Sequence, residues 1–277
     1  MSASAGHPFA GAAKPVYLNF ALKTFQSQAA YKFEYFVGVF NGLLYVFIFT
    51  SLWTAIYSGM SSGADTPFTK TGIITYAVFA MVCRISMTME DTEISSRIRS
   101  GDIAMDMTKP VNFFLMNLSQ TSGVTMFHWF TRVIPILLVC FFAFDLKIPA
   151  EPARLAASAF AWIMGYMIFF MVNFLFALLS FWFVETFSFQ LMKYAFFNLF
   201  SGGIIPIDFF PGWMRPIMDI LPFQYILYTP TAVFTGHLAW PETVRLMSLQ
   251  ALWIVVLGVA CNVMWRSARR KLVVQGG

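Results

Sequence analysis

A short polar stretch, residues 90–110 (EDTEISSRIRSGDIAMDMTKP), holds a large share of the charged groups in a mostly apolar chain. Long apolar segments lie on both sides of it. Asp91 can cap a helix that ends before Gly101, and within that helix Glu93 and Arg97 form a favourable i, i+4 pair. Gly101 supplies a left-handed stop. The sequence therefore predicts a short charged helix with a defined end.

A second helical turn is predicted over residues 102–107, with Ile103 and Met107 on one face, before Lys109 and Pro110 end it. An apolar centre inside a charged rim is typical of a protein contact. The same composition suits a solvated cytoplasmic loop whose basic residues follow the positive-inside rule, and the residues alone do not decide between the two. The rim consists of Arg97, Arg99, Asp102, Asp106 and Lys109.

Ionisable residues also occur inside the apolar segments. Arg84 lies in the second segment and Arg132 near the middle of the third, shortly before Pro135, which is predicted to kink the helix. Charge at such depth is costly and indicates function or internal pairing. The candidate partners are Glu34 and Glu185. Arg84 could instead extend to the inner headgroups, and for Arg132 a buried structural pair is favoured over substrate contact.

Amides and other reactive groups give weaker signals. Asn41, Asn173 and Asn198 sit in apolar segments, where hydrogen bonds between helices are the usual role of such residues. The three cysteines and three histidines are scattered, so neither a metal site nor a disulfide framework is predicted. No GxxxxGK[ST] phosphate loop and no catalytic constellation occur. We therefore expect no catalytic residue, no metal and no cofactor in this chain.

Composition identifies the environment of the chain. It is 58% hydrophobic and 11% charged, whereas soluble domains carry about 25% charged residues. We therefore expect an integral membrane protein, and read the net charge of +5 as a topology signal and not as a nucleic-acid footprint. Continuous apolar runs favour helices over a barrel. The fold class is predicted to be all-α with six transmembrane helices, at about 33–57, 71–89, 119–144, 155–181, 187–207 and 243–265.

The organisation around these spans follows from charge and proline. Residues 1–15 are predicted to be a disordered tail, and 16–277 a single transmembrane domain. Residues 16–32 read as an amphipathic interfacial helix with Leu18, Leu22, Phe25 and Ala29 on its apolar face, or alternatively as an extension of the first span. The bias of Lys and Arg places both termini, and a loop at 90–118, in the cytoplasm.

The connection before the last span is unusual. Residues 201–230 contain five prolines and are nevertheless too apolar for a solvated loop. Broken apolar backbone at membrane depth must pack against protein or line a cavity. Within a predicted outer segment at 208–242 we expect two short re-entrant or interfacial helices, although ordinary packing in the interfacial aromatic belt, with Trp213, is compatible with the same pattern.

These features together resemble the permeases of ABC-2-type transporters over nearly the whole chain after the tail. The stretches IRSGDIAMDMTKPVN (98–112) and SGGIIPIDFFPGWM (201–214) look like signatures of a bacterial branch whose complexes pair two permeases with an ATPase. In such permeases the loop after the second span forms a coupling helix that docks on the nucleotide-binding subunit. The resemblance assigns that role to Arg97, Arg99, Gly101, Asp102, Lys109 and Pro110.

The resemblance implies a permease subunit in a bacterial cytoplasmic membrane that exports an amphipathic or hydrophobic compound. ATP and Mg would be bound by the partner ATPase, and a second permease, identical or related, would complete the pathway. Two other hypotheses remain open here: an ion-coupled transporter using the intramembrane charges, and a scaffold or sensor that recruits a soluble partner. An outer gate is predicted at Gly202, Gly203, Pro206, Phe210, Pro211 and Trp213.

Overall fold

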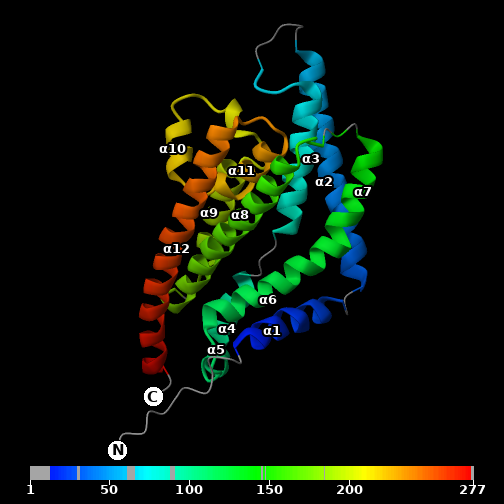
Figure 1. Ribbon diagram of the computed structural model, residues 1–277. Helices are drawn as coiled ribbons and strands as arrows, with labels where there is room; N and C mark the ends of the chain where they lie inside the picture. Colours follow the sequence, from blue (N-terminus) through cyan, green and yellow to red (C-terminus); the bar gives the residue numbers. More distant parts are fainter. Residues whose placement is uncertain are drawn as a thin grey trace, which may run out of the picture.

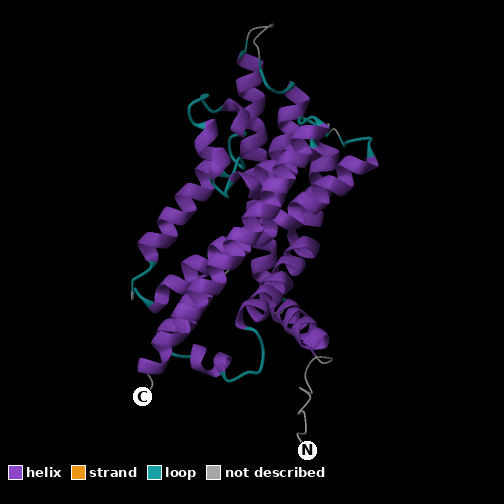
Figure 2. Ribbon diagram, turned by 60° about the vertical axis from the view of Figure 1, so that its left-hand side comes forward, coloured by secondary structure: helices purple, strands orange, loops and turns teal. Residues whose placement is uncertain are grey.

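The computed structural model describes residues 13–29, 32–60, 66–87, 91–144, 146, 148–183 and 185–275, and this part of the chain contains helices and no strands (Figures 1 and 2). The α-helices are α1 (Ala13–Gln28), α2 (Lys32–Gly59), α3 (Lys70–Ser86), α4 (Asp91–Ser100), α5 (Ile103–Met107), α6 (Phe113–His128), α7 (Ile134–Ala143), α8 (Pro152–Leu178), α9 (Phe187–Phe200), α10 (Arg215–Ile220), α11 (Gln224–Phe234) and α12 (Trp240–Gln275). A π-helical segment, η1 (Trp129–Val133), joins α6 to α7, and the 3-10 segments η2 (Leu179–Phe181) and η3 (Ile207–Phe209) follow α8 and α9.

Four helical segments are long and apolar enough to cross a bilayer: Tyr35–Gly59, Phe113–Ala143, Pro152–Phe181 and Trp240–Lys271. The chain is thus a multi-pass helical membrane protein. Helix α3 has 17 residues and α9 has 14, fewer than the roughly 20 that span a bilayer. The boundary predicted for the fifth span was wrong. Helix α9 ends at Phe200 and not at residue 207, because Gly202 takes a left-handed φ of 74° just beyond it.

Helix α1 is separate from the first long helix. It lies along α6 at the lower end of Figure 1, while α2 rises steeply beside it, so α1 does not extend α2. Gly123 of α6 allows the contact, since a Cβ there would lie 2.2 Å from the carbonyl oxygen of Ala21. Leu18 and Leu22, expected on the apolar face, are 61% and 44% exposed. Phe25 of the same predicted face packs against Phe127 of α6, with 5.6 Å between the ring centroids, so this face is only partly exposed.

The proline-rich segment folds into η3, α10 and α11, and α11 is seated inside the helix bundle, where residues 224–233 are all buried against α8, α3 and α12. Side chains of α8 and α12 donate hydrogen bonds to backbone carbonyl oxygens of α11. Ser158 Oγ donates to Pro230 O at 2.9 Å, and Gln250 Nε2 donates to Tyr225 O at 2.8 Å. The chain before α11 is held similarly, with Tyr76 Oη donating to Gly202 O at 2.7 Å.

The third apolar segment is bent in an unexpected way. A kink was predicted at Pro135, which is the second residue of α7. The five residues before α7 form the π-helical segment η1, which contains Arg132. Proline cannot donate to the preceding turn, and one extra residue per turn accommodates the missing bond. The irregularity therefore lies one turn earlier than the proline and positions Arg132.

Replacement of Gly165 by alanine tests the close packing of α11 against α8. A Cβ on Gly165 would lie 2.6 Å from Ile226 O and 3.0 Å from Tyr225 O, so α11 must shift. Thermal and denaturant unfolding in lipid nanodiscs should show a loss of about 1–3 kcal/mol in the free energy of unfolding. Gly258→Ala in α12 is the matched control, since its Cβ meets only Met171 Cε at 3.8 Å. Equal stability of the two variants would contradict this packing.

Candidate functional site

Helices α4 and α5 form one compact unit at the lower end of Figure 1. Gly101 joins them with a φ of 81°, in the left-handed region expected for it. Ile94 is 4% exposed, and α4 packs against the lower parts of α8 and η2. The two-part shape predicted for this stretch is observed, with α4 ending at Ser100. The α4–α5 unit is therefore anchored to the bundle.

Ion pairs hold the α4–α5 unit together. Arg97 Nη1 lies 3.0 Å from Asp106 Oδ2, and the expected pair with Glu93 is present at 3.8 Å. Arg97 Nη2 also donates to Asn117 Oδ1 of α6 at 3.4 Å, while Lys109 Nζ lies 2.7 Å from Asp106 Oδ1. Arg97 thus ties α4, α5 and α6. Asp106, whose side chain is only 10% exposed, is the centre of this network, although it was absent from the coupling residues predicted by resemblance.

The outward surface of the unit differs from the predicted one. Ile103 was expected to share an exposed apolar knob with Met107, but it is fully buried in the core. Burial of Ile103 fixes the inward side of α5, so that Met105, two residues on, faces outward and is 65% exposed, with Met107 at 37%. Met105 therefore takes the exposed apolar position that was predicted for Ile103, together with Met107. The predicted coupling residues that are exposed on the same unit are Arg99, Gly101, Asp102, Lys109 and Pro110.

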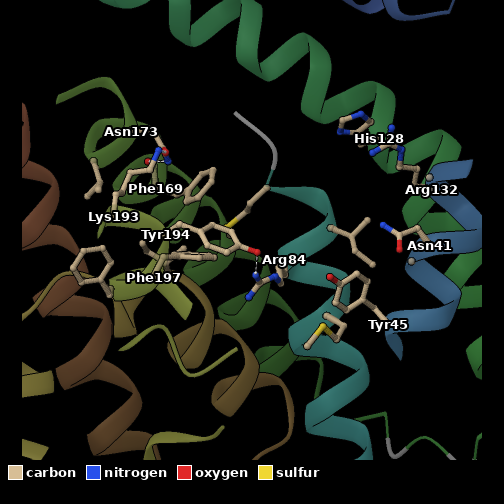
Figure 3. A pocket seen from close by; sticks show the side chains of 18 of the residues that line it. Asn41, Tyr45, Arg84, His128, Arg132, Phe169, Asn173, Lys193, Tyr194 and Phe197 are labelled. Atoms are coloured by element: carbon tan, nitrogen blue, oxygen red, sulfur yellow. Dashed lines mark hydrogen bonds between the residues drawn. The ribbon is translucent and has the colours of Figure 1, made fainter. Parts of the chain in front are cut away.

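A second candidate site is a cavity of about 590 Å³ (Figure 3). It lies among α2, α3, η1, α8, α9 and α11. Arg84, near the end of α3, points into its centre, and the aromatic side chains of α9 lie beside it (Figure 3). No Asp or Glu occurs among the described residues that line it. The polar lining residues are Gln28, Asn41, Tyr45, Arg84, His128, Arg132, Asn173, Lys193 and Tyr194.

Arg84 is held by neutral groups of α9. Its Nη2 donates to Asn198 Oδ1 and to Tyr194 Oη, the latter at 3.3 Å, and its guanidinium carbon lies 5.5 Å from the ring centroid of Phe197. The predicted pairing with Glu185 is wrong. That carboxylate instead accepts the backbone N–H of Phe187 at 2.8 Å, at the start of α9. The side chain of Arg84 thus turns toward α9.

Arg132 reaches the cavity because α2 makes room for it. A Cβ on Gly38 would lie 2.4 Å from Arg132 Nε, and a Cβ on Gly42 would lie 2.5 Å from Ile136 Cδ1. Gly38 and Gly42 have the GxxxG spacing that permits close helix contact in membranes, a signal that sequence reasoning had missed. The side chain of Glu34, the other predicted partner, lies outside the described residues.

Two of the three predicted membrane amides bridge helices. Asn198 of α9 accepts from Arg84 of α3, and Asn173 Oδ1 of α8 accepts from Lys193 Nζ of α9 at 2.6 Å. Asn41 lines the cavity. These amides fix basic side chains in place, so the cavity is lined by positioned groups.

The family model of the ABC-2 family transporter proteins matches residues 43–276. The chain belongs to the ABC-2 transporter family. Comparison with curated proteins and with solved structures gave no match. Membership makes the chain the membrane-embedded permease of an ABC transporter, and it implies a separate ATP-binding subunit as a partner.

The residues predicted for the outer gate of this ABC-2 permease do not form one surface. Gly202, Gly203 and Pro206 are buried, and a Cβ on Gly202 would lie 2.6 Å from Cβ of Tyr228. Trp213 is 70% exposed and lies just before α10, the helix at the opposite end of the molecule from the α4–α5 unit. The glycines therefore serve the close packing of the chain leading to α11. Phe210 is partly buried, and Pro211 is exposed beside Trp213.

The Asp106→Asn variant tests the network of the α4–α5 unit. It keeps the shape of the side chain but removes the charge shared by Arg97 and Lys109. Because Asp106 is mostly buried, the free energy of unfolding should fall by about 1–3 kcal/mol, and proteolysis near Gly101 should become faster. Glu242→Gln, which breaks the exposed pair with Arg245, should cost no more than about 1 kcal/mol. A larger effect of the control would contradict the assignment.

Proposed function

We propose that this ABC-2 permease exports an amphipathic or hydrophobic compound across a bacterial cytoplasmic membrane, driven by ATP that its partner subunit hydrolyses. Family membership supports the permease role. The observation that carries the proposal further is the anchored α4–α5 unit, which presents Met105, Met107 and Arg99 outward. Flexible apolar methionines ringed by charge suit a contact with a soluble protein.

In this proposal, the α4–α5 unit transmits motion of the partner subunit to the helices that line the cavity. The α4–α5 unit follows α3 in the chain, and Arg84 lies two residues before Ser86, where α3 ends. Arg97 links the same unit to α6 through Asn117. A push on the unit would move it as a rigid body against α3 and α6, and so change the opening of the cavity between inward-facing and outward-facing states.

The proposed topology has six spans, with α3 and α9 completing the four long segments, and with both termini in the cytoplasm. The distribution of exposed basic residues supports this orientation. Arg99, Lys109, Arg266, Arg269, Arg270 and Lys271 are exposed at the end that carries the α4–α5 unit. The exposed basic residues at the other end include Arg245, which pairs with Glu242. We place the external gate there, around Phe210, Pro211 and Trp213.

A second permease subunit, a copy or a related chain, would complete the pathway. Helix α9 supports this part of the proposal, since none of its residues is buried although it supplies Lys193, Tyr194 and Phe197 to the cavity. A chain packed on α9 would close that side of the cavity. The competing hypothesis of an ion-coupled charge relay has less support, because Arg84 is bonded to an amide and a phenol and Glu185 to a backbone N–H.

Charge placed on the outward surface of the α4–α5 unit should uncouple the transporter. The double variant Arg99→Glu, Met105→Glu is expected to weaken co-purification with the ATP-binding subunit by about tenfold or more, since unpaired charge in an interface costs several kcal/mol. ATP hydrolysis stimulated by the permease should fall with it. Both side chains are exposed, so the melting temperature should stay unchanged.

The matched control is Lys70→Glu, an exposed residue at the opposite end of α3. It should leave association and hydrolysis as in the unmodified chain. Undiminished association of the double variant, or equal loss in the control, would overturn the docking assignment.

A further inference from the structure

The guanidinium of Arg84 has unused hydrogen-bonding capacity inside the cavity. Its Nη2 is engaged by Asn198 and Tyr194, whereas its Nη1 is buried without a hydrogen-bond partner in the described part of the chain. No described carboxylate pairs with Arg84. A charge without a counter-charge is costly at membrane depth, and the unsatisfied Nη1 adds to that cost.

The surroundings hold this guanidinium in a fixed position. Asn198 and Tyr194 fix one nitrogen, and Phe197 lies against the guanidinium, so little side-chain freedom remains for a ligand to remove. Arginine binds carboxylate and phosphate oxygens through parallel N–H groups. Arg132 and Lys193 line the same cavity, each with contacts of its own. The contact with an anion is therefore assigned to Arg84, and Arg132 and Lys193 add positive charge to the same cavity.

The remainder of the lining is largely apolar. Met81 and Ile85 of α3 flank Arg84 along the helix, and Phe169, Phe223 and Ile226 face it from α8 and the region of α11. The volume of about 590 Å³ falls within the range of small-molecule sites. The cavity thus combines a guanidinium held in position, two further basic side chains and an apolar part of the wall, which together are complementary to a molecule with an acidic head and an apolar body.

We propose that the cavity binds an anionic amphiphile whose phosphate or carboxylate group is held by Arg84. This deepens the proposed function, on which its meaning as a transport site rests, by naming the charge of the transported compound. The same chemistry is presented by a soluble alkyl phosphate and by a lipid with an acidic headgroup. Either source would supply the counter-charge that Arg84 lacks in the described chain.

The test measures binding to the full-length permease in phosphatidylcholine nanodiscs, without the ATP-binding subunit, so that it is independent of coupling. Radiolabelled dodecyl phosphate is the probe, with empty nanodiscs as background. Dodecanol and dodecyltrimethylammonium, which have the same chain length and a neutral or a cationic head, serve as control competitors. Dioctanoyl phosphatidylglycerol, against dioctanoyl phosphatidylcholine, separates a lipid source from a soluble one. The variants are Arg84→Gln, Arg84→Lys and, as a control, exposed Arg266→Gln.

We expect saturable binding of dodecyl phosphate that neither the neutral nor the cationic competitor displaces. Arg84→Gln should weaken it by about tenfold or more, Arg84→Lys by less, and Arg266→Gln not at all. If dioctanoyl phosphatidylglycerol displaces dodecyl phosphate, the ligand is a lipid. If it does not, the ligand is a soluble compound. Equal or stronger binding of the cation to the unmodified chain would overturn the proposal even if Arg84→Gln did not fold. Loss of ATPase coupling with binding retained would count against the proposed function alone.

Discussion

The structure depends on hydrogen bonds to the backbone groups of an irregular segment that is buried away from water. Residues 201–234 contain prolines and left-handed glycine, yet much of this stretch is buried, where each unpaired backbone group costs several kcal/mol. Ser158 of α8 and Gln250 of α12 donate to backbone carbonyls of α11, and Tyr76 of α3 donates to one in the chain before it. Helices α3, α8 and α12 are therefore held around α11 by polar contacts that lipid cannot replace.

This arrangement makes α8 the link between the two ends of the molecule. Gly165 in its middle lets the backbone of α11 approach closely, and its lower end and η2 carry the α4–α5 unit. The cavity with Arg84 lies between these two contacts. A permease built this way is braced around α11 at one end, and at the other end the α4–α5 unit is joined to α6 by a network centred on Asp106.

Local sequence signals predicted local structure well and long-range partners poorly. Apolar runs gave the long helices, and Gly101 gave the break between α4 and α5, because both depend on neighbouring residues only. The partner of Arg84 lies 114 residues away in sequence, as Asn198, and a charge-matching argument selected Glu185 instead. The inward turn of Ile103 depends likewise on how the α4–α5 unit docks on the bundle. These choices are made by packing, which a single sequence does not display.

The central claim is that the α4–α5 unit is the surface that the ATP-binding subunit touches. Site-specific photo-crosslinking tests it most directly, with a photoreactive amino acid placed either at Met105 or at Trp213, which are 65% and 70% exposed at opposite ends. In the assembled transporter, illumination should join position 105 to the ATP-binding subunit and leave position 213 unjoined. A crosslink from position 213, or none from position 105, would contradict the account.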